Sequence, residues 1–185
     1  MVLSRRTIQK RIQSGSLVID PFDEHNLGPA SYDLRLGYTF VELELQYSQR
    51  CIKSATLSES YPTKTTKIGK EDVIVMPPKS FLLGTTLECV AIPTDVAVYV
   101  EGRSSIGRYG LQVQNAGFID PGFDGQITLE LFNASDVPIA LSPMRRICQL
   151  VFFELDEPTE PYSGKYMHQK EATASRAELD YEVKK

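Results

Sequence analysis

Apolar and polar residues alternate over many short stretches of this chain, and a period of two is typical of half-buried β-strands. Turn signals separate the stretches, among them Pro77-Pro78, Pro121-Gly122 and Asp124-Gly125. Many short strands with frequent turns predict an all-β sandwich or a distorted barrel. The predicted strands are residues 31–37, 38–45, 72–76, 80–90, 96–101, 111–114, 126–133, 138–141 and 146–155.

The N-terminal region follows a different pattern. Residues 5–13 place Ile8 and Ile12 on one face of a short helix. Ser4 is the expected N-cap, and Gly15 follows the end of the helix. This is the main helix that the pattern predicts.

Three further segments lack clear strand signals. Residues 21–29 are predicted to form a loop, and residues 48–70, rich in Ser, Thr and Lys, a long polar loop or an exposed hairpin. The charged tail is expected to be mobile when alone, with helix over 175–183. We therefore predict a single domain with three parts: an N-terminal helix (1–15), a β core (30–156) and a C-terminal segment (157–185).

Composition narrows the class of protein. The 185 residues fit one compact domain, and 42% hydrophobic with 24% charged residues is ordinary for a soluble globular protein. The net charge of −4 argues against a surface that coats nucleic acid. The sequence has no apolar run of the roughly 20 residues that a membrane span needs, and its start does not resemble a signal peptide. A cytoplasmic protein is therefore predicted.

The cysteines and histidines do not predict a metal site. Cys51, Cys89 and Cys148 lie far apart in mainly apolar surroundings, so we expect buried, reduced thiols. His25 and His168 lie near opposite ends, and no C-x-x-C or H-x-E motif occurs. A zinc site built by the protein is not expected.

Two cations and two hydroxyls gather in one short segment after a predicted strand. This segment could bind phosphate, because a guanidinium group donates two parallel hydrogen bonds to a pair of phosphate oxygens and hydroxyl groups add further donors. The residues are Arg103, Ser104, Ser105 and Arg108. The alternative is a polar turn followed by a one-turn helix with surface arginines. Composition alone favours this alternative.

Two acids flank a glycine-rich turn. Asp124 precedes Gly125 and reads as a turn aspartate. Asp120 instead follows Phe118 and Ile119 at a strand end, where a carboxylate must be satisfied by turn amides or face a pocket.

Glu130 interrupts an apolar strand. With a period of two, one face carries Ile127, Leu129 and Leu131, and the other carries Glu130 with Thr128 and Phe132. The second face is either solvent or the wall of a site.

Five motifs taken together resemble the dCTP deaminase branch of the dUTPase-like superfamily. They occur in the family's order, and the resemblance extends from the N-terminal helix to about residue 176. The tail Pro161-Tyr-Ser-Gly-Lys-Tyr166, with Gln169, is similar to the segment that covers the nucleotide in that branch. The motifs are Ser31-Tyr-Asp-Leu-Arg-Leu-Gly37, Glu101-Gly-Arg-Ser-Ser-Ile-Gly-Arg108, Ala116-Gly-Phe-Ile-Asp-Pro-Gly-Phe-Asp-Gly125, Ile127-Thr-Leu-Glu-Leu-Phe-Asn133 and Arg146-Ile-Cys-Gln-Leu150.

The resemblance implies a fold and a chemistry. The fold is a mostly β, dUTPase-like distorted barrel or jelly roll that forms homotrimers with active sites between subunits, and also a dimer of trimers. Glu130 would act as general base on the water that attacks C4 of cytosine, in place of the zinc of other deaminases. Arg108 and Ser104 would position the water and stabilise charge in the transition state.

Further roles follow from the same resemblance. Asp120 would read the 3′-hydroxyl and, in the dUTPase step, orient the attacking water. Mg²⁺ would be held by the phosphates; dTTP would be a feedback inhibitor, and Asp33 would support the phosphate site. The implied substrate contacts are Arg103, Ser104, Ser105, Asn115, Ala116, Gly117, Phe118, Asp120, Gln149, Tyr162, Lys165, Tyr166 and Gln169.

The segment around Gly117 bears on the product. The motif Asn115-Ala-Gly-Phe-Ile-Asp120 is similar to that of bifunctional members. The loop between Arg108 and Asp120 is one residue shorter than in most deaminases of the family. The predicted reaction is dCTP plus two waters to dUMP, ammonia and pyrophosphate. The alternatives are a deaminase that releases dUTP, a dUTPase, and a nucleotide-sensing trimer without activity.

Overall fold

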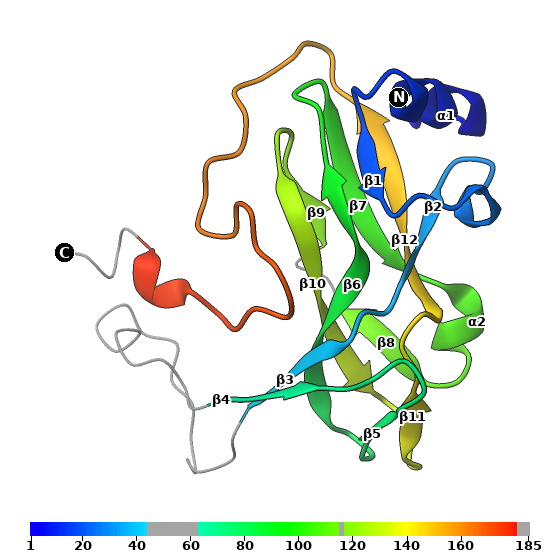
Figure 1. The fold of residues 1–185 in the computed structure, drawn as a ribbon, viewed down its shortest axis with the longest axis vertical. Coiled ribbons are helices and arrows are strands. Elements are labelled where there is room, and N and C mark those ends of the chain that lie inside the picture. Colours follow the sequence, from blue (N-terminus) through cyan, green and yellow to red (C-terminus); the bar gives the residue numbers. More distant parts are fainter. Residues whose placement is uncertain (44–62, 115–116, 181–185) are drawn as a thin grey trace.

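The protein, analysed as a computed structural model that describes residues 1–43, 63–114 and 117–180, is mainly β, as expected (Figure 1). Its helices are α1 (Arg5–Gln13), α2 (Ser104–Gly107) and the 3₁₀ turns η1 (Glu24–Asn26) and η2 (Ala177–Leu179). The strands are β1 (Val18–Asp20), β2 (Tyr32–Arg35), β3 (Thr39–Leu43), β4 (Thr63–Lys67), β5 (Ile74–Met76), β6 (Phe81–Ala91), β7 (Val96–Gly102), β8 (Leu111–Gln114), β9 (Phe118–Ile119), β10 (Asp124–Asn133), β11 (Ile139–Leu141) and β12 (Arg146–Glu154).

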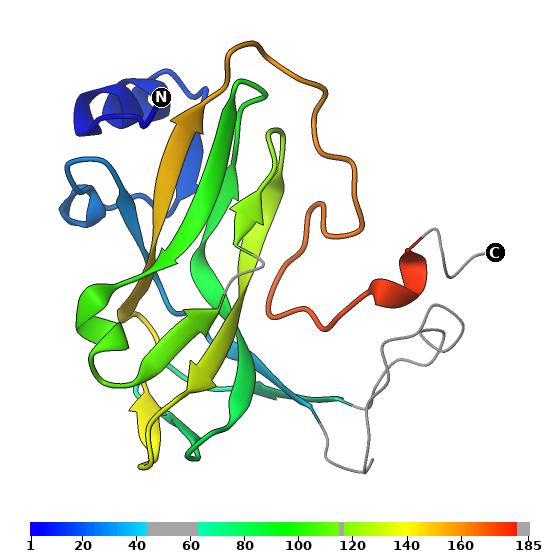
Figure 2. The ribbon, with the colours of Figure 1, turned by 180° about the vertical axis from the view of Figure 1, so that it is seen from behind.

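The strands form three antiparallel sheets. One has the order β4-β3-β6-β10-β8 with β1 added on β6, one has the order β2-β12-β7-β9, and β11 pairs with β5 in a short ribbon. The back view shows the same layers with the C-terminal segment beside β10 (Figure 2). The two larger sheets contribute to one apolar core, in which Tyr32, Phe40 and Phe152 are fully buried.

The sheets do not close into a barrel, which corrects that part of the prediction. Among the described residues, no ladder joins the six-stranded sheet to the four-stranded one, because β4 and β8 end the first sheet and β2 and β9 end the second. Short strands with frequent turns occur in sandwiches and barrels alike, so the pattern could not decide between them.

Most predicted elements are confirmed, and four local corrections follow. β1 was not predicted, and η1 lies within the predicted loop 21–29. β4 lies in the predicted polar segment 48–70, and its partner β3 lies outside that segment, so a strand replaces loop over Thr63–Lys67. The tail has only η2 where helix over 175–183 was expected; residues 181–183, like 48–62, lie outside the described residues.

The N-terminal helix is confirmed with its predicted apolar face. Ile8 is fully buried and Ile12 packs against the core. Ser4 occupies the N-cap position with extended backbone, but its hydroxyl lies 3.2 Å from the Thr7 hydroxyl and caps no helix amide. The helix is therefore held by packing rather than by its cap.

A buried ion pair joins the two larger sheets. The Arg35 backbone N–H and Nε donate to the Glu88 carboxylate at 2.9 and 2.6 Å, and the Glu88 side chain is fully buried. Burial raises the pKa of the Glu88 carboxyl, and the Arg35 guanidinium opposes that shift. The pair fixes β2 against β6 in the interior.

The described cysteines are free thiols. Cys148 is fully buried and Cys89 is half-buried, and burial raises the pKa of both thiols. The prediction of buried thiols is thus confirmed for Cys148 and in part for Cys89, whereas Cys51 lies outside the described residues. None of the described helices is long and apolar enough to cross a bilayer.

Arg11 attaches α1 to the sheet and should make stability depend on pH. Its guanidinium binds both oxygens of Asp95 at 3.0 and 2.8 Å, which lowers the pKa of that carboxyl below its usual 3.8. A carboxyl group whose pKa is lowered by folding stabilises the fold at pH values above its usual pKa. This contribution is lost as the pH falls through the folded-state pKa.

We expect Arg11→Gln to lower the free energy of unfolding at pH 7 by up to about 1 kcal/mol, because the pair is partly exposed. Near pH 3 the difference from the wild type should shrink. Arg6→Gln is the matched control, since Arg6 is exposed and has no ion pair among the described residues. Chemical denaturation at both pH values measures this, and an undiminished difference at pH 3 would contradict it.

Candidate active site

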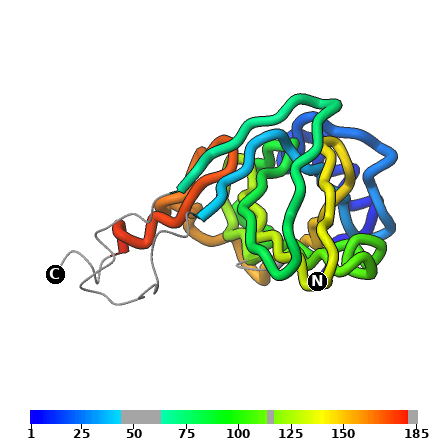
Figure 3. The backbone as a smooth tube through the Cα atoms, turned by 90° about the horizontal axis from the view of Figure 1, so that it is seen from below, coloured from blue at the N-terminus to red at the C-terminus, as the bar shows by residue number. Residues whose placement is uncertain are grey.

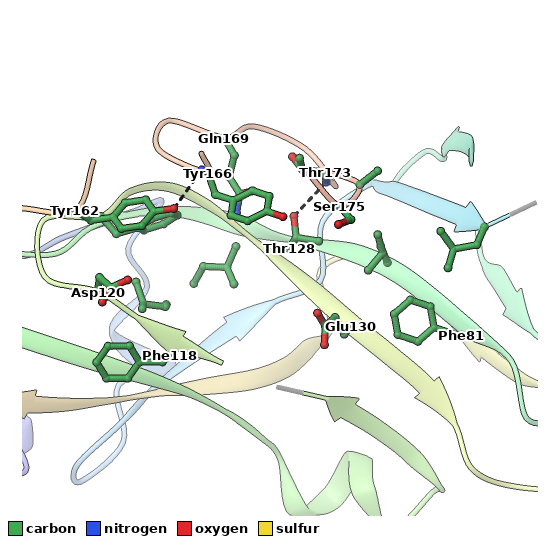
Figure 4. A pocket seen from close by; sticks show the side chains of 16 residues that line it. Phe81, Phe118, Asp120, Thr128, Glu130, Tyr162, Tyr166, Gln169, Thr173 and Ser175 are labelled. Carbon is green, nitrogen blue, oxygen red and sulfur yellow. Dashed lines mark hydrogen bonds between the residues drawn. The ribbon is translucent and has the colours of Figure 1, made fainter. Parts of the chain in front are cut away.

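A cavity of about 440 Å³, here called cavity 1, opens beside β10 (Figure 4). Two acids, several aromatic rings and part of the C-terminal segment surround it. Its walls are Leu43, Phe81, Leu83, Phe118, Ile119, Asp120, Phe123, Ile127, Thr128, Glu130, Tyr162, Tyr166, Gln169, Thr173, Ala174 and Ser175.

Glu130 enters cavity 1 because of the alternation along β10. Leu129 and Leu131 are buried in the core, whereas Thr128 and Glu130 are half-buried and line the cavity. Of the two interpretations of this face, open solvent does not hold for Thr128 and Glu130, which line a cavity, and the role of Glu130 stays a prediction. A half-buried carboxylate on a rigid central strand is well placed to accept a proton from a bound water.

Asp120 lies at the end of β9, as predicted, and also faces cavity 1. Its neighbour Phe118 is 48% exposed at the cavity wall. The Phe118 ring packs edge-on against Tyr99 with centroids 5.2 Å apart, and Tyr99 packs in turn on Phe153. This aromatic row supports the wall from the four-stranded sheet.

The C-terminal segment covers one side of cavity 1 and is docked on β10. The Thr173 N–H donates to the Thr128 hydroxyl at 3.1 Å, and the Glu171 N–H donates to the Gln126 side chain at 2.7 Å. Within the segment, the Tyr166 N–H donates to the Tyr162 hydroxyl at 3.2 Å. Figure 3 shows this segment, orange to red, passing close to β3 and β4.

Gln169 presents an unsatisfied acceptor. Its Nε2 donates to the Gln126 carbonyl oxygen at 2.8 Å, but its buried Oε1 has no partner among the described residues. A buried carbonyl oxygen without a donor is costly, by about 1–3 kcal/mol. Because Gln169 lines cavity 1, a ligand with an N–H group could satisfy it.

A second cavity of about 370 Å³, cavity 2, lies at α2 and β8. It contains three of the predicted phosphate contacts, Arg103, Ser104 and Gln149. α2 and the C-terminal segment lie on opposite sides of the sheets in both ribbon views (Figures 1 and 2). The two cavities have no lining residue in common, so the predicted acids and the predicted phosphate contacts line different cavities of one chain.

The predicted residues divide accordingly. Cavity 1 brings together Phe118, Asp120, Glu130, Tyr162, Tyr166 and Gln169. Ser105 and Arg108 line neither cavity; they are exposed, on α2 and at its end. Gly117 also lines neither cavity, and its carbonyl oxygen accepts a hydrogen bond from the Val100 N–H. Asn115 and Ala116 lie outside the described residues.

Lys165, predicted to contact phosphate, instead pairs with the tail. Its Nζ lies 2.5 Å from the Asp180 carboxylate and 5.5 Å from the Tyr166 ring centroid. The ion pair raises the pKa of Lys165 against the opposing effect of burial. The lysine is thus kept charged at the edge of the C-terminal segment.

Sequence reasoning missed several cavity residues. Thr128 was assigned to the Glu130 face without a role, and Thr173, Ser175 and Phe81 were not singled out. The period of two places Thr128 beside Glu130, so that signal was available. The docking of Thr173 depends on contacts 45 residues apart in the chain, which no local pattern indicates.

The described residues contain no group of three or more His, Cys, Asp or Glu side chains placed to hold a metal ion. The polar side chains of cavity 2 carry guanidinium, hydroxyl and amide groups, all of which can donate hydrogen bonds to an anion.

Comparison with known proteins now identifies the family. A family model described as dCTP deaminase-like matches residues 2–155. The chain belongs to this family. A dCTP deaminase-like relative from Aquifex aeolicus is 45% identical over 186 residues, covering 100% of this chain and 99% of the relative. One from Sulfurihydrogenibium sp. is 42% identical over 191 residues, covering 97% and 99%. Both are named dCTP deaminase, dUMP-forming.

A solved structure shares the fold. The 2′-deoxycytidine 5′-triphosphate deaminase from Agrobacterium tumefaciens superposes with a TM-score of 0.61 at 22% identity. The match covers 81% of this chain and 47% of that chain. The dCTP deaminase-like fold expected from the motifs is therefore confirmed.

Gly122 should control the docking of the C-terminal segment. Its φ is +82°, and a Cβ there would lie 2.5 Å from the Pro161 Cβ and 2.9 Å from the Tyr162 nitrogen. We expect Gly122→Ala to displace the segment and speed trypsin cleavage within 157–180 at least several-fold. Gly15→Ala is the control, because its φ is +75° with nothing within 4 Å. Equal cleavage rates in both variants would disprove the prediction.

Proposed function

We propose that this protein is a zinc-independent dCTP deaminase that releases dUMP, with dCTP plus two waters giving dUMP, ammonia and pyrophosphate. The observation that carries the proposal is Glu130 on β10, facing a cavity that also contains Asp120. The names of the relatives, at 42% and 45% identity over nearly the whole chain, support dUMP rather than dUTP as the product.

In the deamination step, Glu130 takes a proton from water as the oxygen attacks C4 of cytosine. One proton of that water then reaches the 4-amino group, which leaves with the C4–N bonding pair as ammonia. The other proton ends on N3 of the base as the C4 carbonyl forms. The orphaned Oε1 of Gln169 is an acceptor, which suits the 4-amino donor of cytosine. Asp120 would hold the 3′-hydroxyl and then orient the second water, which attacks the α-phosphorus and releases pyrophosphate.

We propose that the complete site forms between subunits of a homotrimer. The acids of cavity 1 and the phosphate contacts of cavity 2 line different cavities of one chain, so one subunit's cavity 2 would meet another's cavity 1. Arg103, Ser104, Ser105 and Arg108 would then reach the nucleotide from the neighbouring subunit. A dimer of trimers and feedback inhibition by dTTP stay predictions.

We propose that Mg²⁺ binds together with the triphosphate of the nucleotide. It prefers oxygen ligands and retains water, so phosphate oxygens would supply most of its coordination and it would neutralise part of their charge. Arg103, Ser104 and Gln149 fit this arrangement, because they donate to phosphate without competing for the metal.

Product analysis tests the function. Pure wild-type protein incubated with dCTP should release dUMP and pyrophosphate in equal amounts. The Glu130→Gln variant should turn over dCTP about 10²–10⁴-fold more slowly, because its side-chain amide cannot accept the proton from water. Binding of dCTP to the variant, measured by calorimetry, should remain. Accumulated dUTP would refute the dUMP-forming activity, and undiminished turnover by the variant would refute the base.

Mixed oligomers test the site between subunits. Glu130→Gln and Arg103→Gln, each nearly inactive alone, should recover about a quarter of wild-type activity when they are dissociated and reassembled together. The reason is that one site in four would combine an intact cavity 1 with an intact cavity 2. Recovery should be absent when the two proteins are mixed without dissociation. No recovery after reassembly would place both halves in one chain.

A further inference from the structure

Asp33 on β2 joins two arginines that are far apart in the sequence. Its Oδ2 lies 3.0 Å from Nε of Arg103 and 3.2 Å from Nη1 of Arg146. Nη1 of Arg103 also donates to the Arg146 carbonyl oxygen at 3.3 Å. One carboxylate thus faces two permanent cations, and this cluster has a net positive charge.

A β-bulge places Arg146 on the same face of β12 as Gln149, a residue that lines cavity 2. The pairing of β12 with β2 shifts register between Arg146 and Cys148. Ile147 and Cys148 are both buried, so Arg146 and Gln149 share the outer face although they are three residues apart. Gln149 lines cavity 2 and is the cross-strand partner of Asp33.

The two guanidinium groups keep unused donors. The Arg146 side chain is 45% exposed, and among the described residues its Nε and Nη2 have no partner. Nη2 of Arg103 is likewise without a partner there. Glu101 on β7 is the cross-strand partner of Gln149 and forms no ion pair with described residues. Both arginines lie on the other side of Gln149, beside Asp33, and the positive charge is concentrated there.

We infer that Arg146 is a further phosphate-binding residue and that Asp33 is a positioning residue, which aligns Arg103 and Arg146 as a pair of guanidinium groups. The inference rests on the proposed function, since the anion is the triphosphate of dCTP at cavity 2. Arg146, the more exposed member, contacts the β- and γ-phosphates, because guanidinium groups bind such oxygens in a bidentate manner.

Calorimetry with dCTP and dCMP, on proteins that also carry Glu130→Gln to stop turnover, tests this role. Arg146→Gln should weaken dCTP binding roughly tenfold and leave dCMP binding unchanged, since dCMP lacks the outer phosphates. Arg146→Lys should recover part of the loss, because it restores charge without the planar fork. Arg145→Gln is the matched control, as Arg145 is the exposed neighbour and lines a different cavity with Tyr109 and Ile139.

Two outcomes would overturn the inference. If Arg146→Gln binds dCTP as tightly as Arg145→Gln does, Arg146 does not contact phosphate. Equal losses for dCTP and dCMP would show a structural role. Failure of the proposed function is distinguishable, because then the parent Glu130→Gln protein would bind neither nucleotide and the wild type would release no ammonia from dCTP.

Discussion

The pairing of β10 with β6 on one side and β8 on the other is the constraint on which the core and cavity 1 both depend. Side chains alternate along the strand, so Leu129 and Leu131 enter the core only when Thr128 and Glu130 face the cavity. A slip by one residue would put the Glu130 carboxylate among apolar side chains, at a cost of at least several kcal/mol. Core packing therefore selects the register that presents Glu130 to cavity 1.

The same strand holds the cover of the cavity. Gln126 and Thr128 receive backbone N–H groups of the C-terminal segment, so the residues that neighbour Glu130 also position Tyr166 and Gln169. The segment adds few buried residues to the core, and its hydrogen bonds to β10 are the main contacts that order it. Segments held in this way open at lower free energy than the core, which suits a cover that must admit a nucleotide.

Sequence patterns predicted α1 and β10 well, because the helix and strand periods can be recognised within one short segment. In both elements the predicted apolar face packs into the core. They did not predict β1, a three-residue strand whose existence depends on β6. They gave no role to Glu88, which lies within the predicted strand 80–90, since its partner Arg35 is 53 residues away. The motifs implied the site residues, but only the fold shows that Arg103 and Glu130 line different cavities.

This separation has an electrostatic consequence. Among the described residues Glu130 forms no ion pair, so no cation of the described part of its own chain occupies its carboxylate oxygens. If the cations come from a neighbouring subunit, they approach Glu130 only in the assembled site. They can then be directed at the phosphates and at charge that develops in the transition state, rather than at the resting carboxylate. Assembly would thus supply the electrophilic half of the proposed site without neutralising Glu130, the base proposed on β10.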